Sequence, residues 1–413
     1  MSKVLVIGGG IVGLTSAYYL QKKGFEVTVL DKGDLSDNCS FGNAGMIVPS
    51  HFIPLAAPGM LSKGIRWMFN SKSPFYVRPS LNPSLIGWGL KFMKHATEKH
   101  VTQSAEPLRD LSLLSKKLYE DLSKEPNFNF ELTNNGILAF YKTEQAAEEE
   151  AHLADKAKAL GLDMAVLSVA ECKALQPNLN LDVLGAVHYR CDAHLYPGKL
   201  MNALLSYLRA NGVSLISGKE VDKIESTGDK ITKVFTGTTA WEADQYVIAT
   251  GSWSPAVAKM ADLNISLMPG KGYSFMEPEP QQRLTIPALL CEARVAITPM
   301  NGSIRYGGTM ELDRINTKVN MQRVKGIVES VPKYFPDLHP ALPDEKKIWY
   351  GFRPSSPDGL PYIGRSTHRK NLIIATGHGM MGLSLGPATG LLVSQIIAEE
   401  KLEMAVESFA ANR

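Results

Sequence analysis

A mixed α/β and α+β fold is predicted for this chain, in which a doubly wound nucleotide-binding domain is combined with a discontinuous antiparallel-sheet domain. Three observations support this prediction. A strand, a glycine-rich turn, a helix and a second strand follow one another at 4–31, and apolar strands beside helices return at 197–255 and 371–399. The intervening stretch 271–312 alternates apolar and polar residues, which is typical of antiparallel strands.

The order of these patterns divides the 413 residues into two domains, each of which the chain visits more than once. The nucleotide-binding domain is expected to comprise 1–78, 195–262 and 348–413. The second domain is expected to comprise 79–194 and 263–347, and to hold the substrate.

Composition and charge exclude several classes of protein. The formal net charge is only +3 and no block of basic residues occurs, so we expect no nucleic-acid partner. The cysteines lie far apart without a CxxC pair, which is typical of free thiols rather than of a zinc site. We find no signal peptide and no uninterrupted apolar run of about 18 residues, and therefore expect a cytoplasmic protein.

The N-terminal segment is predicted to form one βαβ unit. Residues 4–7 are a short apolar run typical of a buried parallel strand. Residues 11–23 have helical periodicity, and Gly24 follows as a natural stop for the helix. Residues 27–30 form the second strand, which ends at Asp31.

The turn "GGGIVG" in this unit carries the spacing of a dinucleotide fingerprint. Gly8 permits a tight turn, Gly10 lets the backbone approach a diphosphate, and Gly13 lets helix and strand pack closely. The diphosphate then meets the positive end of the helix dipole. Asp31 can accept hydrogen bonds from ribose hydroxyls, which disfavours NADP. This fingerprint alone leaves FAD and NAD both open.

Further elements are expected along the middle of the chain. Helices are expected at about 104–125, 144–161 and 197–212, and strands at 136–143 and 183–190. A strand at 244–251 ends in the small residues Ala249, Thr250 and Gly251, which would let the backbone run beside the nucleotide. An ordinary strand-to-loop glycine is the alternative for Gly251.

A second stretch with GxGxxG spacing, "GHGMMG", begins at Gly377. No strand with an acid at its tip is expected after it, so it does not predict a second nucleotide site. It is instead expected to aim the start of a helix, from about Gly386 to Glu399 with Pro387 in its first turn, at an electron-rich group. In a flavoenzyme that group would be the N1–C2=O edge of the ring.

Arg353 stands among tyrosine, phenylalanine and proline in "WYGFRPSSPDGLPYIG", an unusual environment for a solvated charge. A guanidinium there suits a bidentate pair with a substrate carboxylate. An internal ion pair with Asp358 is the alternative, and the residues alone leave both open.

The stretch 61–94 is apolar, aromatic and basic. Such a helix can lie on a membrane surface, as a peripheral contact. A helical lid over the protein's own core is the alternative.

Segments in the order "VLVIGGGIVGLTSAYYLQKKGFEVTVLDK", "SFGNAGMIVPSHFIPLAAPGM", "KGYS", "RPSSPDGLPYIG" and "NLIIATGHGMMGLSLGPATG" make the chain resemble a known family. This is the FAD-dependent D-amino-acid oxidase superfamily, and within it the likeness is greatest to the bacterial D-amino-acid dehydrogenase small subunit. The resemblance runs from residue 1 to about residue 399.

The resemblance implies non-covalent FAD and a Rossmann-like cofactor domain of the glycine oxidase type. It implies oxidative deamination of D-amino acids to 2-oxo acids by hydride transfer from Cα to flavin N5, with electrons passed to a quinone or another acceptor. A D-hydroxyproline dehydrogenase, a glycine or sarcosine-type amine oxidase, and a non-catalytic FAD-binding protein remain alternatives. The hydride transfer needs no catalytic base, because a neutral substrate amine supplies the lone pair that drives it.

The resemblance also implies roles for individual residues. Arg353 matches the arginine that binds the substrate carboxylate, and Tyr273 and His51 are expected in the same pocket. The expected cofactor contacts, in chain order, are Gly8, Gly10, Ile11, Val12, Gly13, Asp31, Lys32, Asn43, Ala44, Gly45, Met46, Val221, Thr250, Gly251, Gly379, Met380, Met381, Gly382 and Leu383.

Overall fold

A computed structural model describes residues 1–59, 75–77 and 82–413. Its N-terminal βαβ unit opens a six-stranded sheet with the order β19-β20-β13-β1-β2-β9. The strands are β1 (Lys3–Ile7), β2 (Glu26–Leu30), β9 (Ser214–Ile216), β13 (Gln245–Ile248), β19 (Tyr362–Arg365) and β20 (Leu372–Thr376). All neighbours are parallel except β19 and β20, which confirms the predicted doubly wound sheet.

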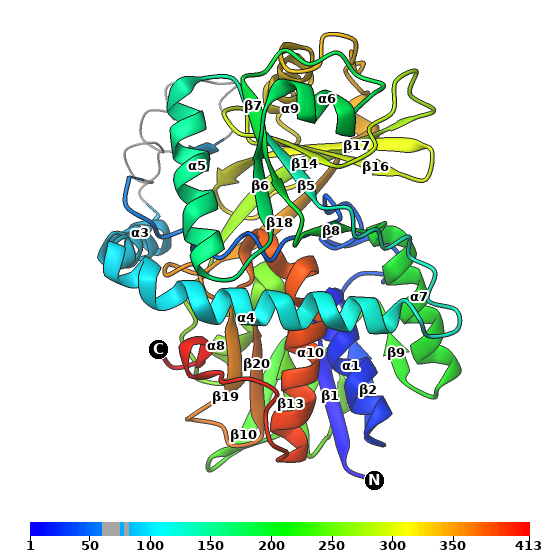
Figure 1. Cartoon of the computed structure of the whole chain (residues 1–413). Helices are drawn as coiled ribbons and strands as arrows, with labels where there is room; N and C mark the ends of the chain where they lie inside the picture. The colour runs from blue at the N-terminus through cyan, green and yellow to red at the C-terminus, as the bar shows by residue number, and fades with distance from the viewer. Residues whose placement is uncertain (60–74, 78–81) are drawn as a thin grey trace.

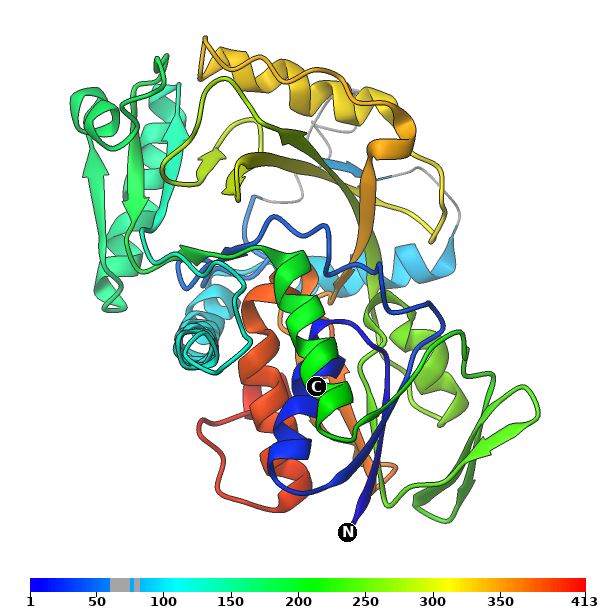
Figure 2. The ribbon, with the colours of Figure 1, turned by 90° about the vertical axis from the view of Figure 1, so that its right-hand side faces the viewer.

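Helices cover one face of this sheet, and a small sheet covers the other (Figures 1 and 2). The helices are α1 (Ile11–Lys22), α7 (Pro197–Ala210) and α10 (Gly382–Ala398), with α4 (Glu98–Leu122) packed on α10. On the opposite face lie α8 (Ser254–Met260) and the three-stranded sheet β10 (Lys223–Thr227), β11 (Lys230–Thr236) and β12 (Thr239–Trp241). Both faces are therefore buried, as the uniformly apolar strands require.

The second domain is built on a nine-stranded, largely antiparallel sheet. Its order is β18-β14-β17-β16-β15-β5-β7-β6, with β4 beside β17. The strands are β4 (Phe75–Val77), β5 (Ile137–Tyr141), β6 (Met164–Leu167), β7 (Gly185–Tyr189), β14 (Met268–Pro278), β15 (Ala288–Leu290), β16 (Val295–Met300), β17 (Ser303–Leu312) and β18 (Trp349–Ser355). The helices that follow or cover these strands are α3 (Pro83–His95), α5 (Glu144–Ala159), α6 (Val169–Leu175) and α9 (Met321–Ser330).

A two-stranded sheet joins the domains, because β3 (Met46–Ile47) pairs with β8 (Ala193–His194). Short 3-10 turns complete the elements: η1 (Gly251–Trp253), η2 (Val331–Lys333), η3 (Glu345–Lys347), η4 (Gly379–Met381) and η5 (Glu407–Phe409).

The domain limits expected from the sequence differ from these sheets in two places. Residues 349–355 form β18 and pair with β14 in the nine-stranded sheet, although 348–413 was assigned to the nucleotide-binding domain. Helix α4 lies across the nucleotide-binding domain against α10, although 79–194 was assigned to the second domain (Figure 1). The expected limit between 78 and 79 lies outside the described residues.

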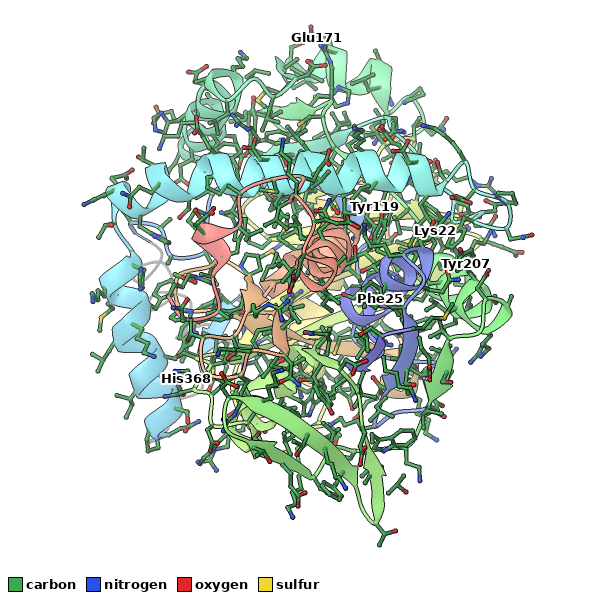
Figure 3. All side chains as sticks on the ribbon, turned by 90° about the horizontal axis from the view of Figure 1, so that it is seen from below. Lys22, Phe25, Tyr119, Glu171, Tyr207 and His368 are labelled. Carbon is green, nitrogen blue, oxygen red and sulfur yellow. The ribbon has the colours of Figure 1, made fainter. Side chains whose placement is uncertain are left out.

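Helix α10 begins four residues earlier than predicted, at Gly382, so Pro387 lies inside the helix rather than in its first turn. Proline has no N–H to bond the carbonyl oxygen of Leu383, four residues before it. The Tyr119 hydroxyl on α4 donates a hydrogen bond of 2.6 Å to that oxygen instead, and the two helices meet beside Tyr119 in Figure 3. Tertiary packing thus satisfies a carbonyl group that the sequence leaves unpaired.

Removing this hydroxyl in Tyr119→Phe is expected to destabilise the protein by about 1–3 kcal/mol, because the buried Leu383 carbonyl would lose its donor. Tyr207→Phe is the matched control: its hydroxyl meets the Gln21 side-chain oxygen at 3.3 Å in a partly buried place. Urea-unfolding midpoints of the two variants measure the difference. Equal midpoints would show that the Leu383 carbonyl finds another partner.

Helix α10 with η4, residues 379–398, is long and apolar enough to cross a membrane by length and composition. Its most apolar window is nevertheless 72% buried inside the protein, against α1 and α4. Among the described residues this is a core helix.

Candidate active site

The glycine turn after β1 is built for close approach of a ligand. Gly8 has a φ of +112°, which a side chain would strain, and a Cβ on Gly13 would lie 1.8 Å from the Gly8 carbonyl oxygen. Helix α1 begins after Gly10, which has no side chain to cap it, and only the first N–H group, that of Ile11, is bonded by a side chain, Ser40 Oγ (3.0 Å). Backbone N–H groups of Val12 and Gly13 therefore remain available for an anionic group.

Asp31 closes the turn from the end of β2. Its carboxylate accepts hydrogen bonds from the backbone N–H groups of Gly9 (2.6 Å) and Gly33 (2.7 Å). Each carboxylate oxygen has a further lone pair, so Asp31 can hold the loop and still accept a ribose hydroxyl.

The other predicted cofactor residues of this domain gather at the carboxyl ends of the same strands. The segment leading to Val221 lies against Asp31, because the Lys219 N–H donates to the Asp31 carbonyl oxygen (2.8 Å). Thr250 and Gly251 follow β13, and the Lys32 ammonium lies 4.1 Å from the centre of the Trp253 ring. Crevices at such strand ends are where α/β sheets bind nucleotides.

The loop Asn43–Met46 is held between the domains. The Arg305 guanidinium donates to the carbonyl oxygens of Phe41 (3.0 Å) and Asn43 (2.6 Å), and Ser274 Oγ donates to that of Gly42 (2.7 Å). Arg305 is 7% exposed, and burial lowers its pKa to about 10. We did not predict Arg305 from the sequence, although a lone arginine in the strand pattern "IRYGG" was a usable indication.

The loop Asn43–Met46 and the turn Gly379–Leu383 lie close together. The Val48 N–H, just after β3, donates a hydrogen bond of 3.0 Å to Ser384 Oγ at the start of α10. No side chain caps the start of α10, and no strand follows it in the described chain, which ends in η5 and coil. The prediction that "GHGMMG" leads into a helix is confirmed.

Arg353 lies on β18 where this strand meets the turn, since Ser355 forms a bridge with His378. Its guanidinium lies flat over Gly272, where a Cβ would be 2.0 Å from Nη1. Nη1 donates a hydrogen bond of 2.7 Å to the Thr309 carbonyl oxygen. Within the described chain Arg353 has no ion-pair partner, and burial lowers its pKa to about 10, which leaves it charged at neutral pH.

The proposed internal ion pair between Arg353 and Asp358 is not formed. Asp358 is bound by Arg413 near the C-terminus, with Nε 2.6 Å and Nη2 3.2 Å from its two oxygens. Asp358 is therefore not available as an ion-pair partner for Arg353.

The pair of Arg413 and Asp358 predicts an acid-dependent contribution to stability. Burial alone would raise the pKa of Asp358, but hydrogen bonds and charge from Arg413 hold it below its ordinary value. A carboxyl group whose pKa is lower in the folded than in the unfolded protein stabilises the fold at pH values above its pKa in the unfolded protein. This stabilisation is lost as the pH falls through the pKa of the group in the folded protein. Arg413→Gln should therefore cost on the order of 2–5 kcal/mol at neutral pH.

The difference between wild type and Arg413→Gln should shrink below about pH 4. Thermal unfolding from neutral to acidic pH measures it. Lys370→Gln, which breaks an exposed pair with Asp229, is the control and should cost less than about 1 kcal/mol. A difference that stays constant with pH would contradict the assignment to Asp358.

Two predicted pocket residues are not brought together with Arg353. Tyr273 follows Gly272 on β14 and so points to the opposite face of the sheet. There its hydroxyl lies 3.3 Å from Glu311 Oε2 and accepts a hydrogen bond from the Asn320 N–H. We therefore leave Tyr273 out of the candidate site.

His51 lies in the loop after β3. Its Nδ1 is 3.4 Å from Ser50 Oγ, and burial together with the charge of Arg294 lowers its pKa to about 4. The described contacts of His51 do not reach Arg353. His51 is thus a neutral residue near the domain boundary, and its role stays a prediction.

Comparison with known proteins identifies the family. Residues 3–396 match the DAO family model, described as FAD dependent oxidoreductase. The chain belongs to this family. D-amino acid dehydrogenases are similar over their full length: that of Helicobacter pylori is 31% identical, covering 95% of this chain and 94% of its own. That of Granulibacter bethesdensis is 32% identical, covering 97% and 96%.

Solved structures of the same fold include glycine oxidase from Geobacillus kaustophilus, with a TM-score of 0.79 and 23% identity, covering 100% of this chain and 99% of its own. L-proline dehydrogenase from P. horikoshii has a TM-score of 0.74 and 20% identity, covering 100% and 97%. These similarities support the predicted fold class of this FAD-dependent oxidoreductase.

The geometry fits FAD as the cofactor of this enzyme. The turn Gly8–Gly13 offers uncapped N–H groups to a diphosphate, Asp31 can accept a ribose hydroxyl, and the turn before α10 offers a second uncapped helix start. FAD supplies the two-electron chemistry of the family when it is bound.

Proposed function

We propose that this enzyme oxidises D-amino acids to 2-oxo acids and passes the electrons to a quinone or another acceptor. The observation that carries the proposal is Arg353, a partly buried guanidinium without an acidic partner in the described chain, next to the turn Gly379–Leu383. Its remaining N–H groups can hold a substrate carboxylate in bidentate geometry. The names of the two bacterial relatives support this substrate class.

Arg353 and the residues around it would orient the substrate relative to the cofactor. Gly272 and Gly351 leave flat backbone under Arg353 and Trp349, because a Cβ on either glycine would meet those side chains. A carboxylate fixed on Arg353 restricts how Cα can be presented to the cofactor, and such positioning lowers the barrier without a protein base. A D-hydroxyproline dehydrogenase and a glycine or sarcosine-type oxidase would use the same arginine and remain the alternatives.

Anaerobic addition of single amino acids to the FAD-loaded protein tests the proposal. Loss of flavin absorbance with D-amino acids, and not with their L-isomers, is expected. Bleaching by D-hydroxyproline or sarcosine alone would assign the alternatives, and no bleaching at all would favour a non-catalytic flavoprotein. Reoxidation of the bleached enzyme by air or by quinone separates oxidase from dehydrogenase.

We also propose a peripheral membrane contact through α3, the described part of the basic aromatic stretch. Trp88 and Phe92 are buried against the second domain, and Trp88 Nε1 donates to the Ser355 carbonyl oxygen (2.8 Å), as expected of a lid. The opposite face exposes Ile86, Leu90 and Met93, at 50%, 59% and 46%, beside Lys91 and Lys94. Residues 61–74 and 78–81 of the same stretch lie outside the described residues.

Because of this face, the protein should float together with anionic liposomes in a flotation assay, and a smaller amount should float with neutral liposomes. Leu90→Glu should reduce flotation, because it places a charge among the exposed apolar side chains. Leu113→Glu on α4, where the leucine is 39% exposed, is the control and should float like wild type. Equal flotation of both variants, or none for wild type, would contradict the contact.

A further inference from the structure

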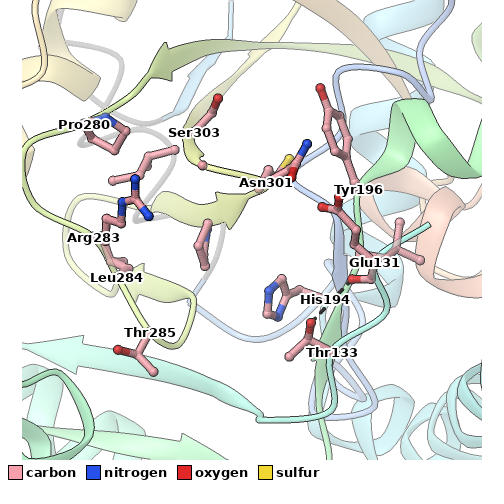
Figure 4. A pocket seen from close by; sticks show the side chains of 15 residues that line it. Glu131, Thr133, His194, Tyr196, Pro280, Arg283, Leu284, Thr285, Asn301 and Ser303 are labelled. Carbon is pink, nitrogen blue, oxygen red and sulfur yellow. Dashed lines mark hydrogen bonds between the residues drawn. The ribbon is translucent and has the colours of Figure 1, made fainter. Parts of the chain in front are cut away.

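A cavity of ≈ 280 Å³ lies in the second domain, apart from the candidate active site (Figure 4). It is open to solvent on one side and is lined by the turn between β16 and β17, by residues 280–285, and by two segments at 131–133 and 194–196. None of the predicted cofactor or substrate residues lines it. The family function therefore does not account for this cavity.

The cavity wall is in direct contact with the loop Asn43–Met46. Leu195 and Met300 both line the cavity and both touch Gly45. The Leu195 N–H donates to the Gly45 carbonyl oxygen (2.8 Å), and a Cβ on Gly45 would lie 2.8 Å from Met300 Cε. A ligand in the cavity would thus be separated by one layer of residues from the loop expected beside the flavin.

The lining mixes apolar and polar side chains, and one of the polar side chains is a buried ring. Leu284, Pro299, Met300 and Ile304 supply apolar surface. His194 is 6% exposed, lines the cavity, and its Nδ1 has no hydrogen-bond partner among the described residues. Burial lowers the pKa of His194 to about 4, so at neutral pH the uncharged ring offers one N–H donor.

The charges on the wall favour an uncharged ligand. Glu131 lines the cavity and is ion-paired with Lys199, so this part of the wall offers no unbalanced charge to an anionic ligand. Arg283 has no partner in the described chain, but it is exposed at the rim, where solvent and salt screen its attraction for anions. A flat, uncharged ring that carries carbonyl oxygens can use both the apolar and the hydrogen-bonding parts of this lining.

We propose that this cavity binds the ring of a quinone-class electron acceptor, with the His194 ring donating a hydrogen bond to one carbonyl oxygen. The proposal rests on the proposed function, for which it names the site of the acceptor. Overall, the amino acid loses two electrons and two protons in becoming an imino acid. The quinone gains two electrons and two protons in becoming a quinol, so the exchange balances.

Calorimetric titration of the oxidised holoenzyme with duroquinone, without amino acid, tests binding independently of turnover. This quinone has no free ring position to which a cysteine could add. His194→Phe and Ser303→Trp, which remove the donor and fill the cavity, should each weaken binding at least about tenfold. His194→Gln, which keeps an N–H donor, should recover part of the affinity.

Ser206→Trp adds the same bulk at an exposed position of α7 and should bind duroquinone like wild type. FAD content and unfolding temperature, measured for every variant, identify any that misfold, and Ser303→Trp serves if His194→Phe does not fold. No binding by wild type, or equal binding by wild type and Ser303→Trp, would overturn the proposal. Pyruvate binding that Ser303→Trp abolishes would overturn it in favour of a carboxylate site.

The two proposals can fail separately. If D-amino acids bleach the flavin but duroquinone does not bind, the acceptor site is wrong and the proposed function stands. If duroquinone binds but no amino acid bleaches the flavin, the proposed substrate is wrong, and the cavity is a quinone site serving another reductant.

Discussion

Replacing Arg353 with leucine is expected to weaken apparent substrate binding on the order of 2–5 kcal/mol, because a bound carboxylate would lose its buried charged partner. The FAD content should stay unchanged, since the predicted cofactor contacts lie on other segments. Stopped-flow bleaching of the flavin at increasing D-amino acid concentration measures the apparent dissociation constant. The flavin spectrum of the same sample measures the cofactor content.

Two further variants sharpen this experiment. Arg353→Lys keeps the charge but loses the planar two-pronged geometry, and should restore only part of the affinity. Arg314→Leu removes an exposed arginine after β17 and should bind substrate like wild type. An unchanged dissociation constant in Arg353→Leu would show that Arg353 serves the structure, through its bond to the Thr309 carbonyl, rather than the substrate.

Replacing Gly13 with alanine is expected to abolish FAD binding and to lower the yield of folded protein. The added methyl group would lie 1.8 Å from the Gly8 carbonyl oxygen and 3.0 Å from the Gly8 carbonyl carbon, which is backbone that cannot rotate away. Helix α1 would have to move off β1, and the N–H groups at its start would no longer face the turn. The ratio of flavin to protein absorbance in the purified variant measures the loss.

Gly89→Ala is the matched control, a glycine inside α3 with open space around its Cβ position. It should bind FAD normally and could gain about 0.5–1 kcal/mol of stability, because alanine favours the helix. Full FAD occupancy in Gly13→Ala would contradict the close packing of α1 on the turn.

Local patterns predicted several of the elements correctly, although the helix expected at 104–125 begins six residues earlier, at Glu98. The first βαβ unit, the helices α5 and α7 and the strands β5 and β7 lie within two residues or so of their expected positions. Such elements are specified by periodicity and by end residues, as with Pro197 and Gly212 around α7, so neighbours in sequence contain the necessary information.

Three features were decided by contacts between distant segments. The start of α10 at Gly382 depends on Tyr119 to bond the carbonyl that Pro387 leaves unpaired. Arg353 forms no ion pair with Asp358, because Arg413 binds this carboxylate instead. The position of Tyr273, facing away from Arg353, depends on the register between β14 and β18.

The sequence by itself determined the family, the cofactor and the fingerprint "GGGIVG". These follow from short motifs whose residues are neighbours in the sequence, so they can be recognised without knowing how distant segments pack. Only the tertiary structure decided that the loop Asn43–Met46, the turn Gly379–Leu383 and Arg353 meet at one place. The same holds for the cavity at His194, which lies behind that loop. The physical reason is that strand pairing across hundreds of residues brings these segments together, and side-chain packing then determines which polar groups remain free to bind a ligand.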